Sequence, residues 1–447
     1  MSEPNQTAPT TAQTAAPSVA FITMGCAKNE VDSADMSAKL VDAGYRIEDD
    51  PEQADVVIVN TCSFIQAATE ESIDAVLEAS SYGNVASGKA KLVVAGCMPA
   101  RYGADLESEL AEASSFVPCS KEDDIVEVID RMLAVSRDSF VEDPAASHRM
   151  AAPASAYVKI SDGCDRFCAY CSIPYIRGRY HSFTADQIEA DVADLVARGT
   201  REIVLIAQDT GRWGQDFDDP LTLAWLIDHL AKKFPATWFR VMYIQPTGVT
   251  DELIDAVAAN DNVCDYFDVP FQHSNPTILA AMNRTGSAEE HLALIHRIRE
   301  RIPNATIRTT LIAGFPGETD DQFEDLCSFV EECELDYIGV FAYSREEGTR
   351  AYRYDDQVDD DEKLERAQRL RDLADDVCTP RIAQRIGATM DVLVLGTEED
   401  GQLYGRAQCQ APDVDGVTYV DAGTPGEFTT VRIDDTLMYE MEGSEVQ

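Results

Sequence analysis

The sequence predicts an α/β protein in three parts: an N-terminal domain with a parallel sheet, a central open, partial barrel of six βα units and a small C-terminal β-barrel. Two observations predict this fold class. Apolar strand-like runs alternate with helical patterns through residues 19–134 and again through 156–345, and residues 387–447 change to short β-rich runs. Alternation of this kind is typical of parallel sheets that carry helices on their faces. With 447 residues, 45% of them hydrophobic, the chain is long and apolar enough for two or three packed domains.

Residues 19–134 are the first predicted domain. Its apolar runs are Val19–Met24, Asp55–Asn60 and Lys91–Ala95, and the helical patterns are Val31–Ala43, Ile65–Ala79, Leu106–Ala113 and Ile125–Leu133. Residues 1–18 have the composition of a disordered tail. Residues 135–155 lose the periodicity and gain small, polar and proline residues, so we expect a linker there.

Residues 156–386 are the second predicted domain. The expected strands are Tyr157–Ser161, Ile203–Ala207, Phe239–Ile244, Tyr266–Pro270, Ile307–Ala313 and Tyr337–Ala342, and helical patterns separate them. Six units are fewer than the eight of a closed barrel, so we expect an open one with functional residues at the strand carboxyl ends. An acidic stretch, expected to be a solvated loop, precedes a trailing helix over Leu364–Ile386.

Residues 387–447 are the third predicted domain, a small barrel of the OB-like kind. The short β-rich runs are Met390–Leu395, Leu403–Cys409, Val417–Val420 and Phe428–Ile433. From residue 386 onward the chain contains 13 acidic residues and only two basic ones, Arg406 and Arg432. A domain of this charge is a poor partner for RNA and a good one for a basic protein.

The whole chain is also strongly acidic, with 36 Lys and Arg against 81 Asp and Glu and a net charge of −45. We therefore expect no direct binding to nucleic acid or to anionic membranes, although an acidic proteome would give the same sign. No apolar run approaches the roughly 18 to 20 residues that span a bilayer. The N-terminal residues lack the pattern of a signal peptide. These observations predict a cytoplasmic protein whose thiols stay reduced.

The strongest chemical signal is the CxxxCxxC spacing of Cys164, Cys168 and Cys171, directly after the expected strand Tyr157–Ser161. Thiolate sulfur suits iron–sulfide cores. A short loop brings three thiolates to three corners of one cluster and leaves the fourth iron open to another ligand. A zinc site is the alternative, but zinc sites favour CxxC pairs with a second pair downstream, and none follows at close range.

A second set is dispersed. Cys26, Cys62 and Cys97 each come just after an expected parallel strand, at intervals of 36 and 35 residues. Because neighbouring parallel strands end side by side, the three thiols could converge on a second cluster, the alternative being three buried and inert cysteines. The remaining cysteines lack this pattern and are expected to be core or surface thiols: Cys119, Cys264, Cys327, Cys333, Cys378 and Cys409.

The CxxxCxxC loop resembles that of the radical S-adenosylmethionine enzymes. The resemblance implies that S-adenosylmethionine binds the open iron and that Tyr170, just before the third cysteine, touches its adenine. It places Gln208, after the second strand of the barrel, near the same cofactor. The segment Ile312–Glu318 also matches a loop of that superfamily.

With Cys26, Cys62 and Cys97 added, the resemblance narrows to methylthiotransferases, which end in a TRAM β-barrel. The segments Gly25–Ser33, Gln208–Thr210, Phe341–Thr349 and Gly405–Gly416 resemble the RimO branch. That branch methylthiolates the β-carbon of an aspartate in the small-subunit ribosomal protein that lines the decoding centre. Two positions depart from its pattern: Ala34 stands directly after Val31–Ser33 where a glutamate is usual, with Asp35 next to it as a candidate substitute, and Cys409 stands where an acidic residue is more usual.

The resemblance implies two [4Fe-4S] clusters, one on each cysteine set, with S-adenosylmethionine, a reducing electron donor and a sulfur donor. It also implies a basic small-subunit ribosomal protein as substrate. The alternatives are a tRNA adenosine methylthiotransferase like MiaB and, outside enzymes, an iron–sulfur electron carrier. Three arginines flank the loop and could bind a carboxylate of cofactor or substrate or face solvent, and one histidine is expected to pack rather than to line the cavity: Arg166, Arg177, Arg179 and His273.

Overall fold

The structure is a computed structural model that describes residues 15–137, 140 and 152–446. It divides into two compact units, one of Met1–Met150 with Tyr175–Arg177 and the other of Ala151–Pro174 with Gly178–Gln447. Most of the expected tail over 1–18, and residues 138–139 and 141–151 of the expected linker, lie outside the described residues. Within the described ranges, no helix is both long and apolar enough to cross a membrane.

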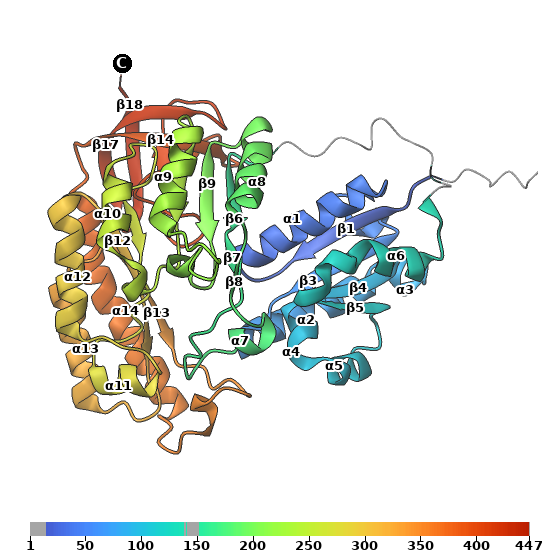
Figure 1. Cartoon of the computed structure of the whole chain (residues 1–447), viewed down its shortest axis with the longest axis horizontal. Helices are drawn as coiled ribbons and strands as arrows, with labels where there is room; N and C mark the ends of the chain where they lie inside the picture. The colour runs from blue at the N-terminus through green and yellow to red at the C-terminus, as the bar shows by residue number, and fades with distance from the viewer. Residues whose placement is uncertain (1–14, 138–139, 141–151, 447) are drawn as a thin grey trace, which may run out of the picture. The chain divides into compact units, whose positions relative to one another are not determined.

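The first unit is built on a five-stranded parallel sheet, blue to teal in Figure 1. Its strands in spatial order are β2 (Arg46–Ile47), β1 (Ser18–Thr23), β3 (Val56–Thr61), β4 (Lys91–Gly96) and β5 (Ser115–Pro118). The three central strands match the expected apolar runs. The edge strands β2 and β5 were not predicted, because two to four residues are too short to show a periodic pattern.

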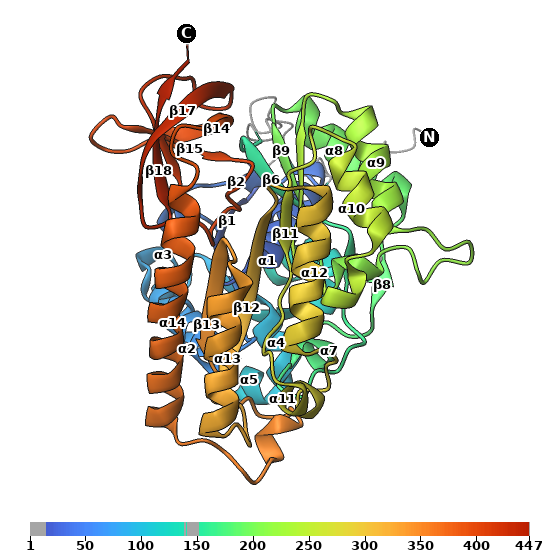
Figure 2. The same cartoon turned by 90° about the vertical axis from the view of Figure 1, so that its left-hand side faces the viewer.

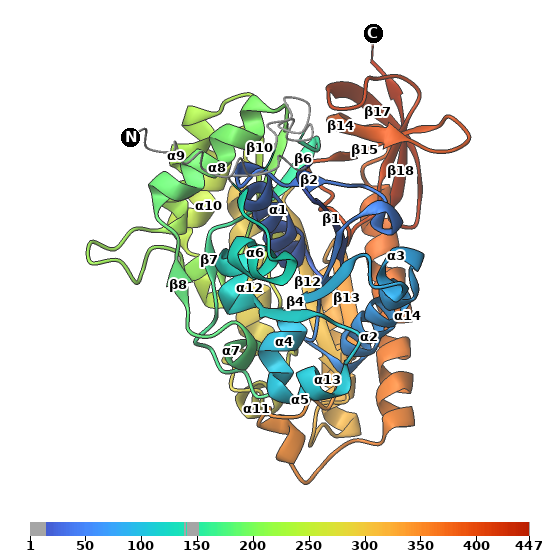
Figure 3. The same ribbon diagram turned by 90° about the vertical axis from the view of Figure 1, so that its right-hand side faces the viewer.

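Helices cover both faces of this sheet. Side chains of α1 (Ala27–Asp42) and α6 (Ile125–Leu133) pack on the face of Val56 and Ile58. The other helices, α2 (Gln66–Ser81), α4 (Cys97–Tyr102) and α5 (Ala104–Glu109), pack on the face of Val57 and Val59, and the short α3 (Gly83–Ala86) follows α2 (Figure 3). Alternate residues of each strand therefore enter different cores.

The second unit contains six parallel strands in a row. They are β6 (Ser155–Lys159), β9 (Glu202–Ile206), β10 (Trp238–Val241), β11 (Tyr266–Asp268), β12 (Thr306–Ala313) and β13 (Tyr337–Ala342). Two three-stranded sheets make up the row, and an isolated parallel bridge from Phe239 to Val263 joins them. The predicted fold class, with an open six-strand barrel at its centre, is confirmed.

Helices line the outside of these strands and share one large apolar core with them. They are α8 (Ala185–Ala197), α9 (Leu223–Lys233), α10 (Asp251–Ala258), α12 (Ala288–Arg301), α13 (Asp320–Cys333) and α14 (Asp360–Ala383), and Figure 2 shows the last three side by side. Part of the acidic stretch expected to be a loop begins α14. Asp359 caps that helix by accepting a hydrogen bond from the backbone nitrogen of Asp361 at 3.0 Å.

Short elements complete the region around the CxxxCxxC loop. The loop lies between β7 (Ser161–Asp162) and α7 (Ile173–Ile176), and β7 pairs with β8 (His181–Ser182). A further short helix, α11 (Pro276–Ala281), follows β11.

The C-terminal residues form a closed five-stranded barrel. Its order is β14 (Thr389–Thr397), β15 (Leu403–Ala407), β16 (Thr418–Val420), β18 (Glu440–Glu445) and β17 (Phe428–Leu437). The strand β18 was missed from the sequence because its residues, EMEGSE, are acidic and small; only Met441 and Gly443 face the interior.

Buried charges join this small barrel to the amino ends of the six strands. Glu202, at the start of β9, accepts a hydrogen bond from Arg240 Nε at 2.9 Å and pairs with Arg406 of β15. Burial opposes ionisation of Glu202, but the charges of Arg406 and Arg240 lower its pKa to about 2. The Tyr266 hydroxyl donates to Asp415 Oδ2 at 2.6 Å.

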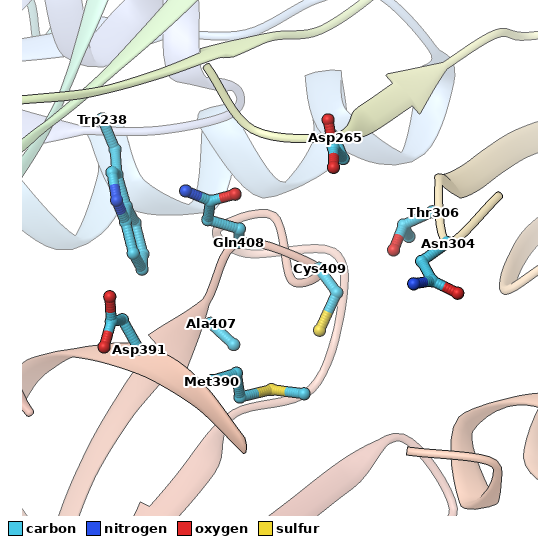
Figure 4. Close-up of a pocket in the computed structure, with 9 residues that line it drawn as sticks. All are labelled: Trp238, Asp265, Asn304, Thr306, Met390, Asp391, Ala407, Gln408 and Cys409. Carbon is cyan, nitrogen blue, oxygen red and sulfur yellow. The ribbon is translucent and has the colours of Figure 1, made fainter. Parts of the chain in front are cut away.

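A pocket of about 290 Å³ lies at the same amino ends (Figure 4). Trp238 and Thr306, which begin β10 and β12, line it together with Cys409 of the small barrel. Active sites of barrels lie at the carboxyl ends of the strands, so this pocket is at the wrong end for the chemistry.

Candidate metal centres

The structure places Cys26, Cys62 and Cys97 at one edge of the first sheet. Cys62 directly follows β3, Cys97 begins α4 after β4, and Cys26 is the N-cap of α1 after β1. These strands are neighbours in register, so their carboxyl ends meet as expected. A Cβ built on Gly25, whose φ is +97°, would lie 2.5 Å from Cys62 Cβ, so the chain approaches Cys62 so closely there that only glycine fits.

One buried amide ties the three strand ends together. Asn29 Nδ2 donates to the carbonyl oxygens of Met24, after β1, and of Thr61, at the end of β3, at 2.8 and 3.0 Å. Its Oδ1 lies 3.9 Å from Cys97 Sγ, which donates to it. Asn29 thus touches the loops that carry all three cysteines, and it is fully buried.

Cys97 has two further polar neighbours that the sequence did not predict there. Arg177 Nη2 lies 3.6 Å from Cys97 Sγ, and the thiol of Cys119 is in hydrogen-bond contact with the same sulfur. The hydrogen bond from Cys119 lowers the pKa of Cys97 against the effect of burial, and the Arg177 charge acts in the same direction. Cys119 was expected to be a plain core or surface thiol, and nothing in its local sequence showed otherwise.

The second set lies on one loop of the other unit. Cys164, Cys168 and Cys171 follow β6 and β7 at the carboxyl end of the barrel. A Cβ on Gly163, with φ +72°, would lie 2.2 Å from the carbonyl oxygen of Arg179, so this position also requires glycine. In both sets, therefore, the residue directly before the first cysteine must be glycine, because a side chain at that position would clash with a neighbouring segment.

Two segments far away in sequence hold this loop. The backbone nitrogen of Ala169 donates to Met282 O at 2.8 Å, and Asn283 Nδ2 donates to Arg166 O and Phe167 O at 2.9 and 3.2 Å. From the other segment, Ala351 N donates to Ala169 O at 2.8 Å. The loop is thus fixed through its backbone, which leaves its thiols to other ligands.

The side chain of Arg284 reaches the candidate ligands themselves. It hydrogen-bonds with Cys168 and with Tyr170, and its Nη2 donates to Pro270 O at 2.6 Å. Neither Asn283 nor Arg284 belongs to a motif found in the sequence, because a chain separation of over 110 residues hides the contact.

The flanking arginines are all engaged by carboxylates. Arg166 pairs with Asp209 at 2.6 Å, and the exposed Arg179 pairs with Asp165 at 2.6 Å. Arg177 is buried and pairs with Asp32 at 2.8 Å. Because Arg177 is buried and already paired with Asp32, it has no room for a substrate carboxylate.

His273 packs as expected. It is fully buried, its Nδ1 accepts from the backbone nitrogens of Ser274 and Asn275 at 3.0 and 2.9 Å, and its Nε2 lies 3.2 Å from Glu318. Glu318 closes the segment Ile312–Glu318 by accepting from Gly314 N at 3.0 Å.

Tyr170 and Gln208 lie close to the loop cysteines. The Tyr170 ring is half-buried among the apolar side chains of Met282 and Ile312, with its hydroxyl toward Cys168. Gln208 Nε2 donates to Asp162 Oδ1 at 3.0 Å. Its buried Oε1 has no hydrogen-bond partner among the described residues, nor has Asp209 Oδ1. Such atoms suit a polar ligand beside the loop.

Each set presents three thiols, and thiolate sulfur is the donor that iron–sulfide cores prefer, so the residues present fit an iron–sulfur cluster. In the described part of the chain, no three His, Cys, Asp or Glu side chains are arranged to hold one metal ion. A cluster differs because each thiolate binds a different iron, so its ligands stand apart. Burial raises the pKa of Cys171 to about 12 and that of Cys62 to about 11, and the neighbouring thiols of each set act in the same direction. Iron binding would therefore have to displace protons.

Three family models match the chain in succession. Residues 18–118 match the uncharacterized protein family UPF0004, residues 158–330 the radical SAM superfamily and residues 386–446 the TRAM domain. The class of protein is therefore a radical S-adenosylmethionine protein with a TRAM domain. Among solved structures, the chain is similar to the radical S-adenosylmethionine methyltransferase TsrM from Kitasatospora setae, at a TM-score of 0.53 and 13% identity over 73% of this chain and 72% of that one. That likeness concerns the fold.

Curated relatives identify the family. The chain is 39% identical to the ribosomal protein uS12 methylthiotransferase RimO of Natranaerobius thermophilus, over 95% of this chain and 98% of the relative. It is 40% identical to the protein of that name from Symbiobacterium thermophilum, over 95% and 90%, and 38% identical to that from Clostridioides difficile, over 95% and 98%. The chain belongs to the RimO family.

Proposed function

We propose that this protein is a radical S-adenosylmethionine methylthiotransferase, an enzyme that replaces a hydrogen on carbon with a methylthio group. Its substrate is the β-carbon of an aspartate in ribosomal protein uS12. The observation that supports this most is the pairing of two three-cysteine sets, each at the carboxyl ends of parallel strands, in a chain whose RimO relatives match it end to end.

We assign one [4Fe-4S] cluster to Cys164, Cys168 and Cys171 and a second to Cys26, Cys62 and Cys97. Each set offers three thiols, which leaves one iron of each cluster for a ligand from outside the chain. The proposed domains are 19–134, 156–386 and 387–447, with a tail over 1–18 and a linker over 135–155. The family-model spans of 18–118, 158–330 and 386–446 support this division.

When bound, the clusters and S-adenosylmethionine supply the radical that takes a hydrogen atom from carbon and the sulfur that replaces it. The chain supplies position. Met282, Asn283 and Ala351 fix the backbone of the loop. We assign contacts with S-adenosylmethionine to Tyr170 and Gln208, and the buried Oε1 of Gln208, which has no partner among the described residues, supports this assignment. An unactivated carbon offers no acidic proton, so the site has no need of a general base.

The charge of the C-terminal barrel supports a basic protein as substrate. Arg406 forms an ion pair with Glu202 and is only 7% exposed. Of the two basic side chains of this barrel, only Arg432 therefore remains to face solvent. A hollow of about 470 Å³ on this barrel is lined by five carboxylates: Glu398, Asp400, Asp421, Asp434 and Glu442. A basic segment of uS12 fits such a surface, whereas RNA is repelled by it.

A tRNA methylthiotransferase is the second candidate, because a TRAM domain is present. The experiment that decides is to express the chain in a bacterium that lacks its own methylthiotransferases, and then to measure the intact mass of uS12 and the tRNA nucleosides of the same cells. We expect uS12 to gain one methylthio group in place of one hydrogen, with unmodified tRNA.

Two variants control this experiment. Cys164→Ala should abolish the product, whereas Cys327→Ala should retain it, because Cys327 packs in α13 within the large apolar core of its unit and belongs to neither set. A methylthiolated adenosine with unmodified uS12 would move the protein to the tRNA branch. Iron in the protein with neither product, and no 5′-deoxyadenosine on reduction, would favour an electron carrier.

A further inference from the structure

We propose that Arg177 is a positioning residue for the cluster on Cys26, Cys62 and Cys97, because its guanidinium donates a hydrogen bond to the sulfur of Cys97. This inference rests on the proposed function, since it needs a cluster at that edge of the first sheet. It gives Arg177 a role other than the carboxylate binding that the sequence suggested.

The placement of Arg177 supports this role. Although it follows the CxxxCxxC loop in sequence, the segment Tyr175–Arg177 belongs to the compact unit of the N-terminal sheet. Its side chain is 2% exposed, and Nη2 lies 3.6 Å from Cys97 Sγ. A buried guanidinium needs partners for its charge and its donors.

Two residues of α1 hold the guanidinium in this orientation. Asp32 Oδ2 accepts from Nη2 at 2.8 Å and is 1% exposed, and Asn29 Oδ1 accepts from the same nitrogen at 3.0 Å. Asn29 also fixes the ends of β1 and β3 through its Nδ2. One network therefore sets the position of Arg177 and the loops of all three candidate ligands.

The chemical consequence follows from the ligand that faces Arg177. An iron-bound Cys97 is a thiolate, and a charge-assisted N–H donor toward it spreads its negative charge. Hydrogen bonds to ligand sulfurs are one of the protein's means of setting the potential of an iron–sulfur cluster. Because reduction adds negative charge, Arg177 should favour the reduced cluster and raise its potential. Residues that orient ligands in this way typically change metal affinity by about 10- to 100-fold when mutated.

The test isolates this cluster in the full-length chain. In a background of Cys164→Ala, Cys168→Ala and Cys171→Ala, only the N-terminal cluster remains, and its iron content, electron paramagnetic resonance spectrum and midpoint potential are measured. We expect Arg177→Gln to shift the potential to a more negative value and to weaken iron retention against a chelator on the order of 10-fold or more. Arg177→Lys keeps the charge and should recover part of the potential.

A matched control is Arg46→Gln. Arg46 lies in β2 of the same unit, at the opposite end of the sheet, and donates to the carbonyl of Ala16 at 3.1 Å. It should leave potential and spectrum unchanged. Equal potentials in Arg177→Gln, Arg177→Lys and the parent background would overturn the role of Arg177 while the proposed function stands. A parent background that binds no cluster at all would instead remove the second cluster from the proposed function.

Discussion

The cysteines of the N-terminal sheet come from three separate strand ends, whereas Cys164, Cys168 and Cys171 share a single loop. In the first region the fold itself brings the three cysteines to one edge of the sheet, and the buried amide of Asn29 connects their loops. In the second region the sequence spacing does so, and segments from elsewhere clamp the loop through its backbone. The first site thus depends on the core of a sheet, and the second on a few hydrogen bonds, some of them exposed.

The largest effects are expected when one cysteine of each set is replaced by alanine. Cys164→Ala should abolish 5′-deoxyadenosine formation and methylthiolation together. Cys26→Ala should stop methylthiolation and leave 5′-deoxyadenosine formation intact. In each variant the iron content should fall from about eight to about four per chain, because one four-iron cluster is lost. Nucleoside chromatography, product mass and iron analysis measure these outcomes. Full methylthiolation by Cys26→Ala would contradict the proposed role of Cys26, Cys62 and Cys97 in methylthiolation.

A second test uses the glycine that precedes the first cysteine of each set. Alanine at Gly25 would meet Cys62, and alanine at Gly163 would meet the backbone of Arg179. Both positions have a left-handed φ, which lowers the stability of a non-glycine residue there by about 1–2 kcal/mol. The clash of the added Cβ lowers the stability by about a further 1–3 kcal/mol. We expect Gly25→Ala to lose only the N-terminal cluster and Gly163→Ala only the other, as seen by iron analysis and spectroscopy.

The control for these glycines is Gly83→Ala. Gly83 has no atom within 4 Å of a built Cβ and no left-handed φ, so the variant should load both clusters. If Gly25→Ala loaded both as well, the close approach to Cys62 would be irrelevant to the site.

A third test removes the buried tie. Asn29→Ala leaves the carbonyls of Met24 and Thr61 without this donor, and a buried group left unsatisfied costs about 1–3 kcal/mol. We expect a lower free energy of unfolding and loss of the N-terminal cluster, with the loop cluster retained. Urea denaturation and iron analysis measure the two effects. A loss of the loop cluster alone would contradict the comparison.

The smallest effect is expected from the exposed clamp. Asn283→Ala removes two hydrogen bonds to the loop backbone, but water can replace them, so the cost should be about 0.5–1 kcal/mol. The loop cluster should still assemble and be lost somewhat faster to a chelator. Asn304→Ala, in the pocket at the far end of the barrel, is the matched control and should change nothing. A cost as large as that of Asn29→Ala would erase the difference between the two regions.

The sequence predicted the strands of the barrel well, because each is an apolar run with a helix after it. It also predicted which strands carry the cysteines. It missed β2, β5 and β18, which are too short or too polar to show a pattern. It could not place Cys119 beside Cys97, or Arg284 beside Cys168, because such contacts depend on packing between distant segments.

Arg177 shows the same limit in a sharper form. Its position six residues after Cys171 suggested a partner for substrate or cofactor, and the structure instead buries it against Asp32 of the N-terminal unit. Sequence neighbourhood describes a loop well, but it does not reveal which core a long side chain enters.

The buried ion pairs of Glu202 have a consequence for how a substrate is selected. Separating the C-terminal barrel from the six strands would leave Glu202, Arg240 and Arg406 as unpaired charges out of water, a cost of about 3–5 kcal/mol for one broken partnership. These buried ion pairs therefore hold the C-terminal barrel at a fixed position relative to the six strands. Under the proposed function, a protein anchored on this barrel presents to the loop of Cys164, Cys168 and Cys171 only a residue at one set distance from its anchor, which predicts selection of the target by geometry as well as by charge.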